Sequence, residues 1–323
     1  MGVNLRDILP PKSLELKSLE GRSIAIDALN SIYQFLSSIR QPDGTPLMDT
    51  QGNVTSHLTG LFYRTTRLLA MGIKPIYVFD GKPHPLKEAE LEKRRALKED
   101  AQEKYEKAKA EGRIEEASKY ARRTSRFTEE MKEDCFSLLS LMGVPAIQAP
   151  GEGEAQCVRL CEKEPDIWAV GSMDYDALLL GAPRLVRGLT LSGKIEPGII
   201  DLEIALRDLE LTREQLIEVA ILVGTDFNPG VKGIGPKKAL ATVKNNEIDS
   251  LDFDFDFAEV KKVFMKPNYT DDYKINWGKV DVVGLKELLC EKHDFAEQRI
   301  TKTAVELEAA YKNFSQQSIS KWF

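Results

Sequence analysis

The chain has 323 residues, of which 42% are hydrophobic and 30% charged, an ordinary balance for a folded globular protein. Its net charge of −6 argues against a uniformly basic nucleic-acid binder, although it allows basic surfaces set against an acidic pocket. No apolar run approaches the length of a membrane span, the opening residues lack a signal-peptide pattern, and the four cysteines complete no zinc site. We therefore expect an intracellular protein with reduced thiols and no membrane contact.

The first predicted elements alternate between strand and helix. They begin with "SIAIDALN", a short β-branched run that stops at Asp27, and continue to "KPIYVFDG", which stops at Asp80. Residues 57–72, between the two runs, show a helical pattern that ends at Gly72. Because a longer helical pattern separates the two runs, each is predicted to be a buried strand of a parallel sheet, with its acid at the carboxyl end.

Residues 86–127 differ from the rest of the chain, because they are dense in charge and poor in large apolar side chains. They are predicted to form two helices broken near Gly112. The simplest interpretation is a solvated helical hairpin or coiled coil. The segment is nevertheless inserted between strands that carry site acids, so it should stand over their pocket. Lys87 and Arg94 are seven residues apart and share a helix face. The basic residues near the end of the segment are Arg122, Arg123 and Arg126. Such an insertion suits contact with a polyanion.

Acids continue to follow apolar segments further along the chain. After a helical pattern over residues 128–143, the stretch "VPAIQAPGEGEAQ" places Glu152 and Glu154 at the start of a helix. The run "DIWAVGSMDYD" leads into Asp174 and Asp176. These two side chains lie on one side of an extended segment, because residues i and i+2 share a face. Asp226 then ends the run "VAILVGTDFNPG".

These acids are predicted to meet, because functional groups of open α/β sheets gather beyond the carboxyl ends of the strands. The set is Asp27, Asp80, Glu152, Glu154, Asp174, Asp176 and Asp226. So many negative charges in one pocket repel one another unless cations neutralise them. An all-oxygen ligand set without His or Cys favours Mg²⁺ or Mn²⁺, and two ions can share it, as in phosphodiester cleavage. Each acid taken alone is equally compatible with helix capping or an ordinary surface position.

The stretch "GVKGIGPKKA" follows the last of these acids. Gly233, Gly235 and Pro236 mark a tight turn, with Pro236 suited to the first position of a helix. Lys237 and Lys238 then occupy a first turn, where a helix usually prefers acids. This mismatch indicates an anion held by backbone amides and the two lysines, and the alternative is an ordinary connection between two helices.

The chain ends in "QQSISKWF". Gln316, Ile319, Trp322 and Phe323 have the spacing of a Q-x-x-h-x-x-a-a motif. Exposed aromatic residues at a frayed end have no structural reason, so we expect the tail to dock. Its docking site is either the body of this protein or a partner.

The motifs together resemble the flap endonucleases of the structure-specific 5′-nuclease family, and the resemblance spans practically the whole chain. Its specific marks are "IAIDALNSIYQFL", "YVFDGKPHPLK", "APGEGEAQ", "MDYDALL", "GTDFNPGVKGIGPKKAL" and "QQSISKWF". The family implies a PIN-like α/β nuclease fold with a mostly parallel sheet, a helical arch, a two-metal site and a helix–two-turn–helix that grips duplex DNA. It implies cleavage of phosphodiester bonds at 5′-flap junctions, together with 5′-3′ exonuclease activity, in DNA replication and repair.

The resemblance also implies roles for single residues. Lys87 and Arg94 match cations that orient the scissile phosphate, and Tyr33 matches an aromatic that stacks on a base, although packing inside "SIYQFL" explains Tyr33 equally well. The turn at Gly233 and Gly235 matches a K⁺ site against a DNA phosphate. For the two metal ions, the resemblance assigns Asp27, Asp80, Glu152 and Glu154 mainly to one, and Asp174, Asp176 and Asp226 mainly to the other.

We therefore expect one nuclease domain over residues 1–315, with the arch at about 82–127, the helix–two-turn–helix at about 215–245, and a tail at 316–323 that binds a PCNA-type sliding clamp. The expected substrate is branched duplex DNA with a 5′ flap, and the expected state is a monomer. No long basic extension follows the aromatic tail, which is typical of an archaeal rather than a eukaryotic enzyme and predicts a cytoplasmic location.

Three other functions compete with this hypothesis. A repair-bubble nuclease or a 5′ exonuclease belongs to the same superfamily, but the short arch and short C-terminal region favour the flap enzyme. A catalytically silent junction sensor or clamp adaptor would have lost site acids, and all seven are present. A protein with a calcium-stabilised acidic rim does not explain the basic arch and the tail.

Overall fold

The computed structural model of the chain describes residues 2–189 and 197–320. Within these ranges, seven strands form one mixed sheet in the order β1-β7-β6-β5-β2-β3-β4. The five strands from β6 to β4 in this order run parallel, and β7 pairs antiparallel with both β6 and β1. The strands are β1 (Lys12–Ser13), β2 (Ser23–Asp27), β3 (Lys74–Phe79), β4 (Ala146–Gln148), β5 (Ile167–Gly171), β6 (Arg184–Arg187) and β7 (Gly198–Asp201). The predicted α/β class with a mostly parallel sheet is therefore confirmed.

The central strands are apolar throughout because both of their faces are buried. In β3, Ile76 and Val78 face one hydrophobic core, while Tyr77 and Phe79 face the other. Successive side chains of a strand point to opposite faces, so a strand covered on both sides has no polar positions to spare. This is why the sequence shows a continuous apolar run rather than an alternating one.

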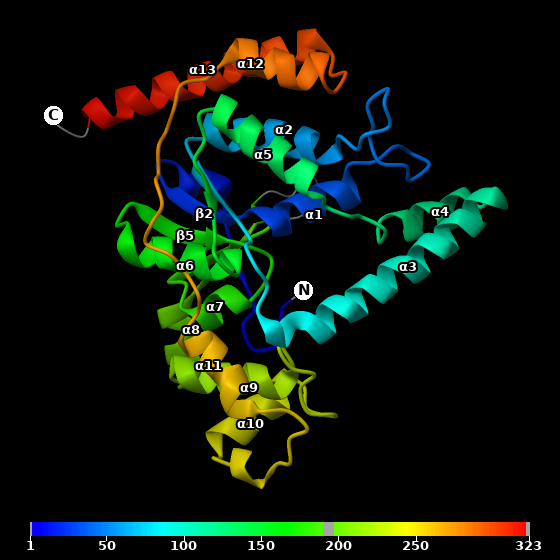
Figure 1. The fold of residues 1–323 in the computed structure, drawn as a ribbon. Coiled ribbons are helices and arrows are strands. Elements are labelled where there is room, and N and C mark those ends of the chain that lie inside the picture. The colour runs from blue at the N-terminus through cyan, green and yellow to red at the C-terminus, as the bar shows by residue number, and fades with distance from the viewer. Residues whose placement is uncertain (1, 190–196, 321–323) are drawn as a thin grey trace.

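Helices cover both faces of the sheet (Figure 1). One core packs beneath α1 (Ala28–Ser38), α2 (Ser56–Ala70), α5 (Glu129–Leu141), α12 (Val282–Lys286) and α13 (Glu297–Ser320). The other packs beneath α6 (Gly153–Lys163), α7 (Asp176–Leu180), α8 (Leu202–Leu209), α9 (Arg213–Val223), α10 (Pro236–Lys244) and α11 (Phe257–Met265). Short helical turns are η1 (Leu16–Leu19), η2 (Pro85–Lys87), η3 (Ile248–Ser250) and η4 (Glu287–Glu291).

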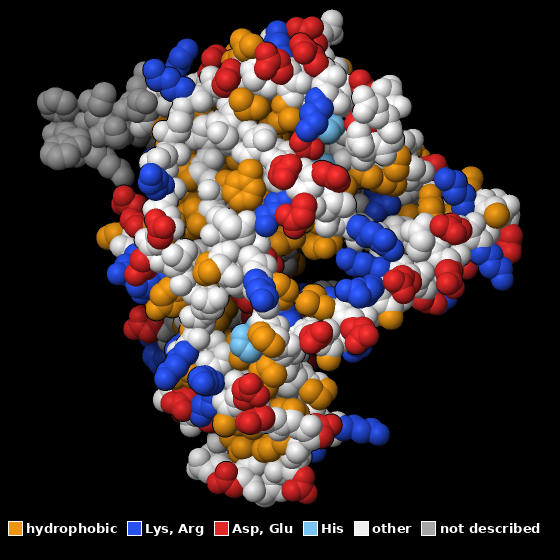
Figure 2. Space-filling model, in the orientation of Figure 1, with side chains coloured by type: hydrophobic (Ala, Val, Ile, Leu, Met, Phe, Trp, Pro, Cys, Tyr) orange, Lys and Arg blue, Asp and Glu red, His pale blue; other side chains and the backbone are white. Residues whose placement is uncertain are grey.

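The predicted two-helix insertion stands away from the body as an arch of α3 (Glu88–Ala110) and α4 (Ile114–Ala121) (Figure 1). The helices break at Gly112, which has a φ of 70° and so a conformation that favours glycine. Within these two helices the buried side chains are all alanines, at positions 101, 108, 117 and 121. Figure 2 shows Lys and Arg side chains gathered on the arch around an opening between it and the body.

The C-terminal part of the chain is mostly helical. Helices α9 and α10 pack together across the glycine turn, where the sequence predicts the helix–two-turn–helix. Helix α13 carries the chain to Ser320, across the junction at residue 315 between the expected domain and its tail. The four cysteines form no disulfide. No helix of the described residues is long and apolar enough to cross a membrane.

Candidate active site

Acidic side chains lie at the carboxyl edge of the sheet, where the sequence predicts them. Asp27 is the last residue of β2 and caps α1, because its carboxylate accepts a hydrogen bond from the backbone N–H of Asn30 at 3.0 Å. Asp80 follows β3, and its Oδ1 accepts from the Gly153 amide at 2.6 Å. A Cβ at Gly153 would lie 2.6 Å from the same oxygen, so any larger residue would displace the Asp80 carboxylate. The backbone thus fixes two of the acids directly.

The other five acids come from neighbouring segments of the same edge. Glu152 is the N-cap residue of α6, and Glu154 lies in its first turn. Asp174 follows β5, and Asp176 is the first residue of α7. Asp226 follows the end of α9 and is 7% exposed. We call these seven residues the acid cluster.

Mutual repulsion links the members of the acid cluster. Burial, and after it the charge of Glu152, raises the pKa of Asp80 to about 6. Burial, followed by the charges of Asp226 and Asp174, raises the pKa of Asp176 to about 7. These carboxylates are therefore close enough to oppose one another's ionisation.

The pKa values of Asp27 and Glu154 are raised for the same reasons. Burial raises the pKa of Asp27 well above its usual range, and the charges of Asp80 and Asp174 raise it further. Burial likewise raises the pKa of Glu154, with added repulsion from Asp174, Asp176 and Asp27. Since each acid interacts with at least one other, the structure brings all seven sequence-predicted carboxylates together.

Two cations from the base of the arch reach into the acid cluster. Lys87 Nζ forms ion pairs with Glu152 and, at 3.3 Å, with Asp226 Oδ2. Arg94 Nη2 donates to Asp226 Oδ1 at 2.6 Å, while its Nε donates to Glu90. Burial alone would lower the pKa of Lys87, but Glu152 and Asp226 outweigh it and raise that pKa. The two residues that the sequence places on one face therefore both point into the site.

The acid cluster has the donor chemistry of a site for hard divalent cations, because its side-chain ligands are all oxygens with unfavourable mutual charge. Within the described residues, no three His, Cys, Asp or Glu side chains are already arranged to hold a metal ion. Their oxygens instead accept hydrogen bonds from backbone amides and the arch cations, as at Asp80 and Asp226. The donor set fits such an ion, because an ionised carboxylate that accepts one of these hydrogen bonds keeps further lone pairs for a cation.

Tyr33 lies under the arch beside the acid cluster. Its side chain belongs to α1 and is 37% exposed, so it is not simply packed within its helix. Lys98 Nζ of the arch lies 4.7 Å from the centre of the Tyr33 ring, and Phe127 contacts its edge. Burial and the charge of Asp80 raise the pKa of Tyr33. An exposed aromatic face therefore stands next to the acids.

The turn before α10 leaves its backbone open to solvent. Gly233 has a φ of 82°, and Gly235 is the N-cap residue of α10 with extended backbone. Nothing lies within 4 Å of a Cβ built on either glycine. Lys237 and Lys238 are exposed in the first turn of α10. Arg122 and Arg123 are exposed at the end of α4, so they lie on the arch rather than in the acid cluster.

Comparison with known proteins places the chain in a family. Residues 1–101 match the XPG N-terminal domain, and residues 143–226 match the XPG I-region, together more than half of the chain. The chain is 51% identical to Flap endonuclease 1 of Pyrococcus abyssi, over 100% of this chain and 98% of that protein. It is 47% identical to Flap endonuclease 1 of Methanothermobacter thermautotrophicus, over 100% of both chains. The chain belongs to the flap endonuclease family.

Solved structures agree with this assignment. Flap endonuclease-1 from Methanococcus jannaschii has a TM-score of 0.81 and 43% identity, covering 97% of this chain and 99% of that one. The catalytic core of Rad2, in complex with DNA substrate, has a TM-score of 0.74 and 25% identity, over 95% and 100% of the two chains. The flap endonuclease fold is therefore the fold of this chain, and the family is one of metal-dependent nucleases that cleave DNA.

Three hydrogen-bond donors that position acids of this flap endonuclease site were not predicted from the sequence. Asn30 donates from Nδ2 to Asp174 Oδ2 at 3.1 Å and accepts from the Met173 amide, so it ties α1 to the end of β5. Ser172 Oγ donates to Glu154 at 2.8 Å. A backbone amide near the start of the chain, that of residue 3, donates to Asp176 Oδ1 at 2.9 Å. Asn30 carries the only local signal of the three, because it lies three residues after Asp27 at a helix start.

The four residues of the expected clamp motif lie at the end of the chain. Gln316 and Ile319 belong to the last turns of α13, whereas Trp322 and Phe323 lie outside the described residues. The docking hypothesis for the tail therefore stays a prediction.

Proposed function

We propose that this protein is a structure-specific 5′-flap endonuclease, with 5′-3′ exonuclease activity, that acts in DNA replication and repair. The observation that carries the proposal is the meeting of seven carboxylates with two arch cations at one edge of the sheet. Hydrolysis of a phosphodiester needs an activated water and compensation of the charge that develops on the phosphate. The combination of acids and cations suits both needs.

The acid cluster is assigned to two Mg²⁺ ions, for which Mn²⁺ substitutes because both prefer oxygen ligands. One ion would be held mainly by Asp27, Asp80, Glu152 and Glu154, and the other mainly by Asp174, Asp176 and Asp226. When bound, such a pair supplies an activated water and neutralises charge on the leaving oxygen. The hydrogen bonds from the Asn30 side chain and the Gly153 amide keep two of the acids in place.

Lys87 and Arg94 are assigned to the scissile phosphate. In the structure they neutralise Glu152 and Asp226, and phosphate oxygens are alternative partners of the same charge and geometry. Because both cations stand at the base of the arch, a phosphate that reaches the acid cluster must pass beside them. They therefore orient the phosphate and stabilise the charge that it gains during cleavage.

The arch is assigned to the single-stranded flap. Figure 2 shows basic side chains around its opening, and Lys98 Nζ of α3 lies 4.7 Å from the centre of the Tyr33 ring. A basic groove with an aromatic ring is the usual surface for single-stranded nucleic acid, since charges track the backbone and the ring stacks on a base. Arg122 and Arg123 extend this basic surface along the arch. Neutral substitution of both should weaken binding of flap DNA more than binding of plain duplex.

The turn before α10 is assigned to the duplex. Lys237, Lys238 and the amides at the helix start suit a phosphate, and the open backbone at Gly233 and Gly235 suits a K⁺ ion next to it. A double alanine variant of the lysines tests this assignment through the salt dependence of binding. The slope of log affinity against log salt should flatten by about one unit for each phosphate that the variant no longer neutralises. An unchanged slope would indicate that the turn before α10 is only an ordinary connection between two helices.

The tail at residues 316–323 is assigned to a PCNA-type sliding clamp. The spacing of Gln316, Ile319, Trp322 and Phe323 places one aliphatic and two aromatic side chains on one side of a helical turn, where they bury much area with few rotors to freeze. Removal of the tail should abolish clamp binding but leave clamp-free cleavage unchanged. Loss of intrinsic activity would instead indicate docking on the body. We also propose a monomeric enzyme of the archaeal cytoplasm.

One experiment separates this function from its competitors. Cleavage of 5′-flap, bubble and nicked duplexes with Mg²⁺ should be fastest for the flap and should leave a nick that a ligase seals. Faster cleavage of the bubble would identify a repair-bubble nuclease. Tight binding of the flap without cleavage would identify a silent junction sensor, which the full set of acids argues against.

A further inference from the structure

A long extended segment crosses one side of the molecule. It comprises residues 266–281, here called the strap, and connects α11 to α12 without forming a helix or a strand of its own. In Figure 1 it runs from α11 near the bottom, past α6, to α12 at the top. Irregular segments of this length are uncommon inside a compact domain and are usually functional when they are ordered. The length of the strap therefore indicates a role beyond connection.

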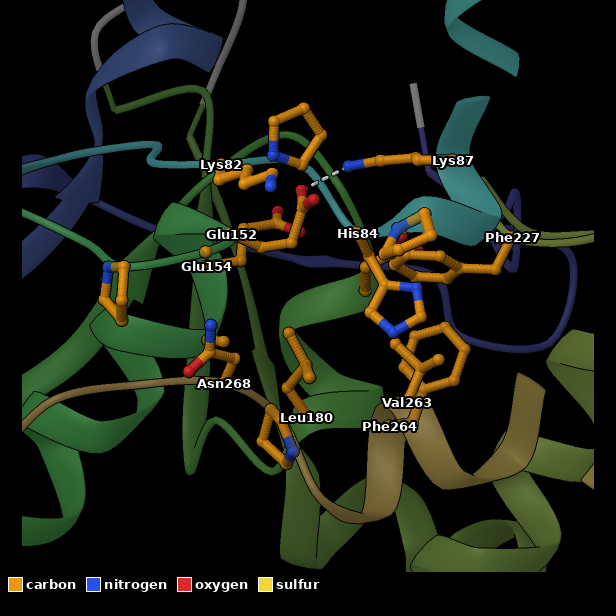
Figure 3. A pocket seen from close by; sticks show the side chains of 17 residues that line it. Lys82, His84, Lys87, Glu152, Glu154, Leu180, Phe227, Val263, Phe264 and Asn268 are labelled. Atoms are coloured by element: carbon orange, nitrogen blue, oxygen red, sulfur yellow. Dashed lines mark hydrogen bonds and ion pairs between the residues drawn. The ribbon is translucent and has the colours of Figure 1, made fainter. Parts of the chain in front are cut away.

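The strap leaves α11 beside a cavity of about 300 Å³, here called the aromatic cavity. Three rings form one of its walls, those of His84, Phe227 and Phe264. Asn268 of the strap lines the same cavity as Glu152 and Glu154, and Figure 3 shows it below the two acids. A Cβ built on Gly151 would lie 3.3 Å from Asn268 Nδ2. The strap thus passes directly against the segment that carries two members of the acid cluster.

One face of α6 then follows the strap. The residues of this face are spaced by three or four positions and are Glu152, Gln156, Arg159 and Lys163. Neighbouring residues such as Cys157 and Leu160 lie in the core instead. Because this face begins with Glu152, a contact that holds the face also fixes the position of that acid.

Gln156 makes the buried contact between the strap and α6. Its side chain is 0% exposed. The amide Nε2 donates to the Thr270 carbonyl at 2.9 Å, and Oε1 accepts from the Thr270 N–H at 2.8 Å. One side chain therefore satisfies both backbone groups of a strap residue, as a neighbouring strand would.

The contacts further along α6 are more exposed. Arg159 donates two hydrogen bonds of 2.7 Å to the carboxylate of Asp271, a side chain that is 52% exposed. The Tyr273 hydroxyl donates to Glu164, just beyond the end of α6, at 2.9 Å. Exposed ion pairs contribute little to stability, whereas a buried polar group left without its partner is costly. The Gln156 pair is therefore the contact whose loss should matter most.

Both ends of the strap are anchored. Before it, Phe264 of α11 is fully buried. At its far end the Gly278 N–H donates to the Gly143 carbonyl at 2.9 Å, and the Asp281 N–H donates to the Leu141 carbonyl at 2.8 Å. A segment fixed at both ends is able to hold the helix that it crosses.

We propose that Gln156 is a positioning residue for the metal site, because it fixes the first turn of α6 against the strap. This inference rests on the proposed two-metal function and adds a residue to it. Glu152 and Glu154 lie within one turn of Gln156, so a shift of this turn moves two metal ligands. Groups that orient metal ligands without touching the ion typically change metal affinity by about 10- to 100-fold when they are removed.

Gln156→Met tests the proposal. Methionine keeps the length and most of the bulk of the side chain but forms no strong hydrogen bond. The matched control is Tyr273→Phe, which removes one hydrogen bond between the strap and the far end of α6. If Gln156→Met does not fold, Gln156→Asn takes its place, because the shorter side chain cannot keep both hydrogen bonds to Thr270.

Two measurements are made on each protein. Thermal melting without DNA, over a series of Mg²⁺ concentrations, gives the affinity for Mg²⁺ independently of activity. Single-turnover cleavage of a 5′ flap over the same series gives the Mg²⁺ concentration for half-maximal rate and the rate at saturation.

In Gln156→Met, the Mg²⁺ concentration for half-maximal stabilisation should rise about tenfold, and the concentration for half-maximal cleavage should rise with it. The rate at saturating Mg²⁺ should stay within about threefold of the wild-type rate, because every ligand is still present. Tyr273→Phe should lower the melting temperature in Mg²⁺-free buffer without moving either concentration.

The outcomes separate this inference from the proposed function. If the wild type neither gains stability from Mg²⁺ nor cleaves a 5′ flap, the proposed function is wrong and this inference fails with it. If the wild type does both and the Gln156 variant keeps the wild-type Mg²⁺ concentrations, the amide only supports the fold and the inference is overturned. An equal rise in Tyr273→Phe would also overturn it, because the effect would then follow the stability of the strap and not the position of the acids.

Discussion

Two buried groups of ionisable side chains lie in different parts of the molecule and are built in opposite ways. The acid cluster at the sheet edge contains only carboxylates and depends on Lys87 and Arg94 of the arch for positive charge. The second group, here called the histidine cluster, joins acids and imidazoles between α2, α5 and the turn that follows η4. Its members are His57, His293, Asp49 and Asp134.

Three members of the histidine cluster, His293, Asp49 and Asp134, lie against one another. The two ring nitrogens of His293 lie 3.2 Å from Asp49 Oδ2 and 3.2 Å from Asp134 Oδ2. Lys292 Nζ lies 2.6 Å from Asp134 Oδ1. Burial would raise the pKa of Asp49, but hydrogen bonds from Asn53 and His293 outweigh it and lower that pKa. These contacts tie three distant chain segments together, whereas both ring nitrogens of the buried His57 have no hydrogen-bond partner among the residues that the structure describes.

This difference distinguishes a buried group of charges that binds an external ion from one that only stabilises the fold. In the acid cluster, burial and then the charges of neighbouring carboxylates raise the pKa of Asp80 and of Asp176, an arrangement that folding alone would not favour. In the histidine cluster His293 lies between Asp49 and Asp134, and Lys292 pairs with Asp134, which stabilises the fold. The first pattern indicates a site for external cations, and the second indicates a structural joint.

The largest expected effect is the loss of cleavage in Asp174→Ala. The variant should be inactive with Mg²⁺ because it lacks one ligand of the two-metal site. Flap binding should survive, since it depends on phosphate contacts elsewhere. Single-turnover cleavage and a binding titration measure the two effects, and near-normal turnover would refute the metal assignment.

A smaller loss is expected for the arch cations. Lys87→Ala or Arg94→Ala should slow single-turnover cleavage by about 10² or more, because these groups act on charge that develops in the transition state. Lys104→Ala is the matched control, since its exposed side chain on the same arch pairs only with Asp100 among the described ion pairs. If binding weakens while the rate at saturation holds, the two cations serve only as part of the basic surface.

A substitution in the histidine cluster should lower the stability of the protein without changing its rate of cleavage. His293→Gln leaves two buried carboxylates short of a partner and should lower the free energy of unfolding by about 2 kcal/mol. Urea unfolding without divalent ions measures this change. Cleavage at a temperature well below the transition should stay near the wild-type rate, and a large loss of rate in folded protein would contradict the structural role.

A still smaller effect concerns acid conditions. His57 is 1% exposed, and burial lowers its pKa from 6.5 to about 4. At a pH between these two pKa values, His57 is protonated in the unfolded chain but neutral in the folded chain. The folded state therefore loses stability relative to the unfolded state as the pH falls. Between pH 6.5 and 5 the loss should reach about 1 to 2 kcal/mol.

Comparison with His57→Phe isolates this contribution, because every other titrating group is common to both proteins. As the pH falls from 7 to 5, the unfolding free energy of the wild type should decrease relative to that of the variant. A difference that is constant from pH 7 to pH 5 would show that His57 does not titrate as its burial demands.

The two clusters also differ in how far the sequence predicts them. The acids lie at the ends of apolar runs, so the strand pattern and the rule for parallel sheets are enough to bring them to one edge. The break of the arch at Gly112 and the turn at Gly233 are predicted for similarly local reasons.

The histidine cluster and the aromatic cavity have no such local signal. His57 and His293 are separated by most of the chain, and no spacing connects them to Asp49 or Asp134. His84 and Phe227 meet only because η2 and the end of α9 pack at the same place. Contacts between distant segments depend on tertiary packing, which a pattern of neighbouring residues does not contain.

Thermal melting with and without Mg²⁺ tests most directly that the acid cluster is a metal site. Mg²⁺ should raise the melting temperature of the wild-type protein by roughly 2 to 4 °C for each kcal/mol of binding free energy, because it binds the folded chain and relieves repulsion among the acids. The increment should be the same in His293→Gln and should be lost in Asp174→Ala. A wild-type protein that Mg²⁺ does not stabilise, or an equal increment in Asp174→Ala, would contradict the account.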